Sequence, residues 1–130
     1  MVFVAAMAQK KTLLIVDDDQ DLRGAIAEQL QAENFQTVEA ATAGEGVRMA
    51  RDEKPDLILL DVMMPKLSGF EVCKKLRADS ATRDIGVLMV TALDQPNDIE
   101  RAIDAGTDDF MTKPIHKSEL LLRTRALVES

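Results

Sequence analysis

Five short apolar runs alternate along this chain with five longer segments whose apolar residues recur at helical spacing. The runs span residues 12–16, 35–39, 56–60, 85–90 and 107–111, and the helical patterns lie at 22–30, 43–51, 70–76, 99–103 and 120–127. Apolar runs of about four to eight residues are typical of strands buried on both faces. The alternation predicts right-handed βαβ units, hence an α/β fold with a five-stranded parallel sheet and helices on both faces.

The length fits one domain. The chain has 130 residues, of which 46% are hydrophobic and 30% charged, close to the globular average. We assign residues 11–130 to a single domain and residues 1–10 to an N-terminal extension. The apolar start of that extension precedes Lys10 and Lys11, whereas a secretory signal has its positive charges first.

Charge and residue counts exclude several functions. The net charge of −7 disfavours direct binding to nucleic acid or to anionic membranes, and the absence of Trp and Tyr disfavours base stacking. No apolar run approaches the ~20 residues that a membrane span needs. A single cysteine, Cys73, cannot form an internal disulfide, which fits the cytoplasm. A single histidine, His116, excludes a metal site made of several histidines.

Polar residues follow four of the predicted strands. Asp17–Asp19 come after the first strand, Asp61 after the third, Thr91 after the fourth and Lys113 after the fifth. Each has an ordinary explanation when taken alone, and Asp19 in particular reads as a helix N-cap. Ligands of open parallel sheets bind beyond the carboxyl ends of the strands. We therefore expect three carboxylates, one hydroxyl and one ammonium group to meet at one edge.

Such a cluster needs cations. Carboxylates a few ångströms apart cannot all stay ionised unless positive charge offsets them. Lys113 supplies one charge, and a hard divalent ion with oxygen ligands, Mg²⁺ or Mn²⁺, would supply two more. A carboxylate in this setting can attack phosphorus and form an aspartyl phosphate. A nucleotide-binding or flavodoxin-type enzyme is disfavoured, because no glycine-rich phosphate loop follows the first strand.

These residues resemble the receiver domains of bacterial two-component response regulators. The resemblance covers roughly residues 11–129, and its motifs occur together, in order and at strand ends. It implies a flavodoxin-like (βα)5 sheet with strand order 2-1-3-4-5; receivers of the chemotaxis type are a standard example of that order. The stretches that carry the resemblance are residues 14–19, Asp61–Pro65 with Gly69, Val90–Ala92 and Gly106–Pro114.

The resemblance also implies a metal site and a phosphorylation site. Asp61 would be the phosphoacceptor. Asp18 and Asp61 would bind Mg²⁺ or Mn²⁺ through their carboxylates, and the backbone carbonyl of Met63 would be a third ligand. Asp17 would hold the ion through water.

A two-state switch is implied as well. Lys113 would pair with the phosphoryl group, or with Asp61 before phosphorylation, and a cis peptide bond would join Lys113 to Pro114. Thr91 would donate its hydroxyl to the phosphoryl group and so make room for Phe110 to turn inward. Because Phe110 replaces the tyrosine of many receivers, no phenolic hydroxyl takes part.

One branch of the family dimerises through the fourth helix, fifth strand and fifth helix. Asp108, Asp109 and Arg123 stand where that branch uses charged pairs across the dimer. A solvated surface is the alternative interpretation, because exposed ion pairs are individually weak.

The leading hypothesis is a Mg²⁺-dependent signalling switch in a two-component phosphorelay. A sensor histidine kinase or a histidine phosphotransfer protein would phosphorylate it. It is not expected to be an enzyme beyond phosphoryl transfer to its own aspartate and slow autodephosphorylation. The alternative is a pseudo-receiver, an adaptor that is never phosphorylated. The sequence of the stretch 61–113 is most similar to receivers attached to cyclic-di-GMP enzymes, which is a weak indication of the output module. The cognate kinase, output module and oligomeric state stay open.

Overall fold

The computed structural model describes residues 10–92 and 95–129, and in it strands and helices alternate as predicted. The strands are β1 (Thr12–Val16), β2 (Gln36–Ala40), β3 (Leu57–Leu60), β4 (Gly86–Thr91) and β5 (Asp109–Thr112). The helices are α2 (Gln20–Ala32), α3 (Ala43–Glu53), α4 (Gly69–Ala78), α5 (Pro96–Ala105) and α6 (Lys117–Val128). In the described part of the chain, no helix has the length and hydropathy to cross a membrane.

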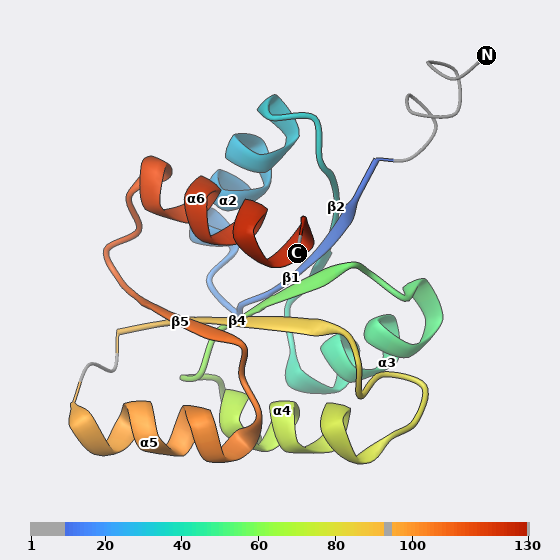
Figure 1. The fold of residues 1–130 in the computed structure, drawn as a ribbon, viewed down its shortest axis with the longest axis vertical. Helices are drawn as coiled ribbons and strands as arrows, with labels where there is room; N and C mark the ends of the chain where they lie inside the picture. The colour runs from blue at the N-terminus through green and yellow to red at the C-terminus, as the bar shows by residue number, and fades with distance from the viewer. Residues whose placement is uncertain (1–9, 93–94, 130) are drawn as a thin grey trace.

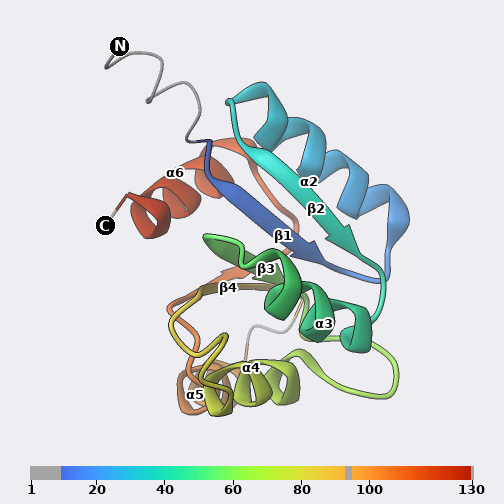
Figure 2. The ribbon, with the colours of Figure 1, turned by 90° about the vertical axis from the view of Figure 1, so that its right-hand side faces the viewer.

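All strand pairs are parallel, and the sheet order is β2-β1-β3-β4-β5. The predicted flavodoxin-like order is confirmed. Helices α2 and α6 cover one face of the sheet, and α3, α4 and α5 cover the other (Figure 1). Figure 2 shows α2 lying along β1 and β2. The carboxyl ends of β1, β3 and β4, the three central strands, therefore meet at one edge.

The strands contribute side chains to two hydrophobic cores, because successive side chains of a strand point to opposite faces of the sheet. Leu14 and Val16 pack with α3, α4 and α5, whereas Leu13 and Ile15 pack with α2 and α6. Helix α2 begins where predicted, because the Asp19 carboxylate accepts hydrogen bonds from the amides of Asp21 and Leu22.

The fifth strand begins two residues later than predicted, at Asp109 instead of Thr107. The Thr107 hydroxyl lies 3.1 Å from the carbonyl oxygen of Val87 and 2.7 Å from that of Asp109. The Asp108 carboxylate accepts from the amide of Val87 at 2.8 Å. These side-chain bonds hold the segment in a bend, a competition that apolar periodicity does not reveal.

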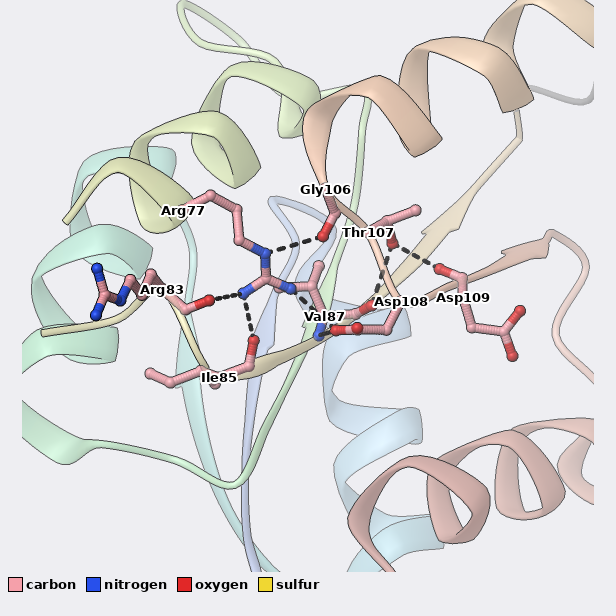
Figure 3. Close-up of polar contacts among 8 residues, drawn as sticks. All are labelled: Arg77, Arg83, Ile85, Val87, Gly106, Thr107, Asp108 and Asp109. Atoms are coloured by element: carbon pink, nitrogen blue, oxygen red, sulfur yellow. Dashed lines mark hydrogen bonds and ion pairs between the residues drawn. The ribbon is translucent and has the colours of Figure 1, made fainter. Parts of the chain in front are cut away.

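Arg77, near the end of α4, binds the segments that lead into β4 and β5 (Figure 3). These strands begin at the end of the sheet opposite to the strand-end aspartates. Its Nε donates to the carbonyl oxygen of Gly106 at 2.9 Å, and Nη2 lies 2.9 Å from Asp108. Its Nη1 donates to the carbonyl oxygens of Arg83 and Ile85 at 2.8 and 2.6 Å. One side chain therefore joins the C-terminal end of α5, the α4–β4 loop and the approach to β5.

Candidate phosphorylation site

Three carboxylates meet beyond the carboxyl ends of β1 and β3. One oxygen from each of Asp17, Asp18 and Asp61 lies within 4.8 Å of the others. Asp17 and Asp61 are buried, 3% and 4% exposed, whereas Asp18 is exposed. The register aligns Val16 with Leu60, so the two strands end level and deliver their aspartates side by side.

Lys113 brings positive charge to the same place. Its Nζ lies 3.3 Å from Oδ2 of Asp17 and 3.6 Å from Oδ1 of Asp61. The peptide bond to Pro114 is cis, as the family resemblance implies. The Lys113 amide also donates to the carbonyl oxygen of Thr91 at 2.7 Å, which anchors the lysine beside the end of β4. The expected pairing with Asp61 is therefore shared with Asp17.

Backbone amides hold the two buried carboxylates. Oδ1 of Asp17 accepts from the amide of Asp19 at 2.9 Å, and Oδ1 of Asp61 accepts from the amide of Met63 at 3.2 Å. Burial, followed by the charge of Asp17, raises the pKa of Asp61 to about 6, against the lowering effect of Lys113 and the Met63 amide. Asp61 is a carboxylate held in an environment that disfavours its own charge.

The loop after β3 passes very close to the start of α4. A Cβ atom placed on Gly69 would lie 2.5 Å from the carbonyl oxygen of Asp61 and 2.7 Å from the Cα of Val62. The Gly69 amide donates to the carbonyl oxygen of Val62 at 2.9 Å. Only glycine allows this approach, so Gly69 fixes the path of the chain immediately after Asp61.

The two predicted switch residues, Thr91 and Phe110, lie on neighbouring strands, β4 and β5. Thr91 is completely buried and ends β4. Phe110 lies on β5, is half-buried and packs against the core formed with α3, α4 and α5. Met63 exposes its side chain at the surface beside Asp61. Asp18 also lines two cavities of about 450 and 470 Å³, one against the start of α3 and one against Phe70 and Arg101.

The three predicted interface residues make contacts within the chain. Asp108 pairs with Arg77. Nη1 of Arg123 lies 3.0 and 2.9 Å from the two carboxylate oxygens of Asp109, and its Nε lies 3.1 Å from Glu119. These side chains are away from the carboxylate cluster: Asp108 joins α4 to the approach to β5, and the contact of Asp109 with Arg123 joins β5 to α6.

A family comparison decides the identity of the fold. The profile of the response regulator receiver domain matches residues 13–125. This chain belongs to the receiver domain family. The chain is 42% identical over 116 residues to "DNA-binding dual master transcriptional regulator RpaA" of a Synechocystis strain, covering 89% of this chain and 48% of that one. The receiver spans about half the length of the first curated relatives that it matches.

Solved receiver structures superpose closely on this one. A putative response regulator from Chloroflexus aurantiacus has a TM-score of 0.89 at 28% identity, with 94% of this chain and 100% of that chain covered. The receiver domain of the sensor histidine kinase PA1611 from Pseudomonas aeruginosa has a TM-score of 0.86 at 25% identity, with the same coverage. That structure has a magnesium ion coordinated in its active site cleft.

The residues present in this receiver suit a hard divalent cation. All candidate ligands are oxygen atoms, and two of the three carboxylates are buried. Burial, and then the charges of the neighbouring aspartates, raise the pKa of Asp61. Sequence reasoning missed Arg23, whose Nη1 donates to the carbonyl oxygen of Asp17 at 2.7 Å. No spacing rule points to an arginine that binds a backbone carbonyl.

Proposed function

We propose that this receiver is phosphorylated on Asp61 and acts as a two-state switch in a two-component phosphorelay. The observation that carries the proposal is the environment of Asp61: a buried carboxylate with a pKa of about 6, beside two further aspartates and 3.6 Å from the ammonium of Lys113. Such perturbed groups are characteristic of reactive sites.

The donor would be a phosphohistidine of a sensor histidine kinase or a histidine phosphotransfer protein. An Asp61 carboxylate oxygen attacks phosphorus, the P–N bond breaks, and its electron pair stays on the imidazole. Lys113 stabilises the phosphoryl oxygens, and the Thr91 hydroxyl donates to one of them. In autodephosphorylation, water attacks phosphorus, the P–O bond to Asp61 breaks, inorganic phosphate leaves and the carboxylate is restored. No other catalytic activity is assigned.

Asp18 and Asp61 would hold a Mg²⁺ or Mn²⁺ ion with the backbone carbonyl of Met63, and Asp17 would contact it through water. Such an ion offsets the charge of the carboxylates and of the incoming phosphoryl group. The chain itself contributes the fixed positions, because backbone amides anchor the Asp17 and Asp61 carboxylates.

Phosphorylation would shift an equilibrium between two states of the receiver, with Thr91 moving towards the phosphoryl group and Phe110 turning inward. The surface formed by α5, β5 and α6 would report the change, for instance by homodimerisation. Exposed Ile99 and Ile103 on α5 and exposed Leu122 on α6 support that surface. We place the receiver in the cytoplasm, where a histidine kinase presents its phosphohistidine.

Incubation with phosphoramidate and Mg²⁺, followed by intact mass measurement, tests the proposal. Wild type is expected to gain the mass of one phosphoryl group, and Asp61→Asn none. Asp52→Asn, which removes a negative charge from the exposed face of α3, is the matched control and should react like wild type. Equal labelling of Asp61→Asn would show that Asp61 is not the phosphoacceptor and would overturn the proposal. No labelling of wild type, even with its kinase, would favour the adaptor hypothesis.

A further inference from the structure

Arg23 lies behind the carboxylate cluster and joins three elements. It belongs to the first turns of α2 and is 13% exposed at its side chain. Nη1 donates to the carbonyl oxygen of Asp17 at 2.7 Å, and Nε lies 2.9 Å from Oε1 of Glu39 on β2. A largely buried guanidinium therefore connects the end of β1 to α2 and β2.

The contact with Asp17 controls the geometry of the next residue. The carbonyl oxygen of Asp17 belongs to the peptide group that joins Asp17 to Asp18, and a peptide group is planar. Holding this oxygen fixes the direction in which the chain enters Asp18. The Asp17 amide is fixed as well, because it donates to the carbonyl oxygen of Ala40 at 3.1 Å. The fixed backbone therefore sets the direction in which the exposed carboxylate of Asp18 leaves the chain.

The charge of Arg23 is largely compensated where it stands. Glu39 pairs with the guanidinium, so the net field that Arg23 adds to the cluster is small compared with that of Lys113, whose ammonium directly faces Asp17 and Asp61. The contribution of Arg23 is therefore one of position more than of charge. A lysine in its place would keep the charge but lose the planar, two-pronged donor geometry.

We propose that Arg23 is a positioning residue for cation binding, which aims the Asp18 carboxylate at the site by fixing the Asp17–Asp18 peptide. This inference rests on the proposed function, since it presumes that the cluster binds Mg²⁺. Partners that orient metal ligands change metal affinity by about 10- to 100-fold when they are removed. We expect an effect at the lower end, because the hydrogen bond from the Asp17 amide to the carbonyl oxygen of Ala40 persists.

Calorimetric titration with MgCl2 tests the inference. Arg23→Gln is expected to weaken Mg²⁺ binding about tenfold, and Arg23→Lys should recover only part of the loss. Arg125→Gln is the matched control: it removes an arginine that pairs at 2.6 Å with Glu33, at the far end of α2, and should bind Mg²⁺ like wild type. Backbone ¹H–¹⁵N spectra recorded without Mg²⁺ should show the amides of Asp18 and Asp19 displaced in Arg23→Gln and unchanged in Arg125→Gln.

Glu39→Gln separates position from general stability. It removes the ion pair of Arg23 but keeps the donor to the Asp17 carbonyl, so Mg²⁺ affinity should change by less than about twofold. Wild-type affinity in Arg23→Gln, or an equal loss in Glu39→Gln, overturns the inference and leaves the proposed function standing. If wild type itself binds no Mg²⁺, the proposed function fails first. Should Arg23→Gln not fold, the intermediate affinity expected of Arg23→Lys decides.

Discussion

Lys113 donates to Asp17: its Nζ lies 3.3 Å from Oδ2 of a carboxylate that is almost fully buried. The ammonium is thus shared between two aspartates and lies slightly nearer to the one that is not the proposed phosphoacceptor. Burial and the charge of Asp17 raise the pKa of the Asp61 carboxyl group, and the shared ammonium offsets this rise only in part.

Removing the shared charge should raise the pKa of Asp61 further. Lys113 lowers that pKa from the value burial alone would give, so Lys113→Met is expected to move it above the present value of about 6. Carboxyl ¹³C chemical shifts followed across pH would measure the midpoint. Lys117→Met, an exposed lysine of α6, is the control and should leave the midpoint in place. An unchanged midpoint in Lys113→Met would show that the ammonium is not seated at the pocket.

The pH dependence of stability follows from the same group. Asp61 has a folded-state pKa of about 6, above its ordinary 3.8, so its stabilising contribution is complete below about pH 3.8 and is lost as pH rises through 6. Asp61→Asn should therefore be more stable than wild type above pH 7, by about 1–2 kcal/mol after allowance for solvent screening. The advantage should vanish near pH 4.

Urea unfolding followed by far-ultraviolet circular dichroism measures this difference, since the chain has no Trp or Tyr for fluorescence. Millimolar Mg²⁺ should reduce the advantage of Asp61→Asn at neutral pH, because ligands stabilise only the form that binds them. A wild-type protein as stable as Asp61→Asn at every pH would contradict the raised pKa.

Two glycine substitutions should have opposite effects. In Gly69→Ala, the new Cβ meets the backbone of Asp61 and Val62, so the loop after β3 must shift, and we expect a loss of about 1–3 kcal/mol together with weaker Mg²⁺ binding. Gly24→Ala, on α2, meets nothing within 4 Å and should gain up to ~1 kcal/mol from helix propensity. Urea midpoints and calorimetry test both, and a neutral Gly69→Ala would refute the close approach.

Dimerisation should follow activation. Beryllofluoride with Mg²⁺ mimics the phosphoryl group, and light scattering at high protein concentration should then show a dimer. Ile103→Glu, which puts a charge on the exposed apolar face of α5, should keep the protein monomeric, whereas Ala32→Glu at the exposed end of α2 should not. A monomer in the beryllofluoride-treated wild type would exclude the dimer. Asp109 and Arg123 already form an ion pair within one chain, so an ion pair between these residues across a dimer would have to replace it.

The part of the site that could be predicted from the sequence consists of the residues that end the strands. A buried parallel strand must end before its first charged residue, so Asp17 and Asp61 marked the carboxyl edge, and the parallel register then brought them together. The start of β5 was not predictable in this way, because Thr107 and Asp108 bind Val87 through side chains. The role of Arg23 could not be predicted for a related reason. Its partner is the backbone carbonyl of Asp17, and every residue has such a carbonyl.

Asp108 illustrates the same limit. Its partner Arg77 is 31 positions away in the sequence, and only the packing of α4 against α5 brings them within 2.9 Å. The resemblance to dimeric receivers suggested a role for Asp108 between chains. In this structure its carboxylate is already bound by Arg77 and by the amide of Val87.

The Arg77 contacts also bear on how this domain opens. Because one guanidinium holds the carbonyls of Arg83, Ile85 and Gly106, the α4–β4 loop and the C-terminal end of α5 cannot separate from each other while it stays in place. Local fluctuations near this end should therefore involve residues 77–87 and 105–108 as a single cooperative unit, with amide protons that exchange at similar rates. Conformational changes at the edge that carries Asp61 would then take place while the opposite end of the sheet stays fixed.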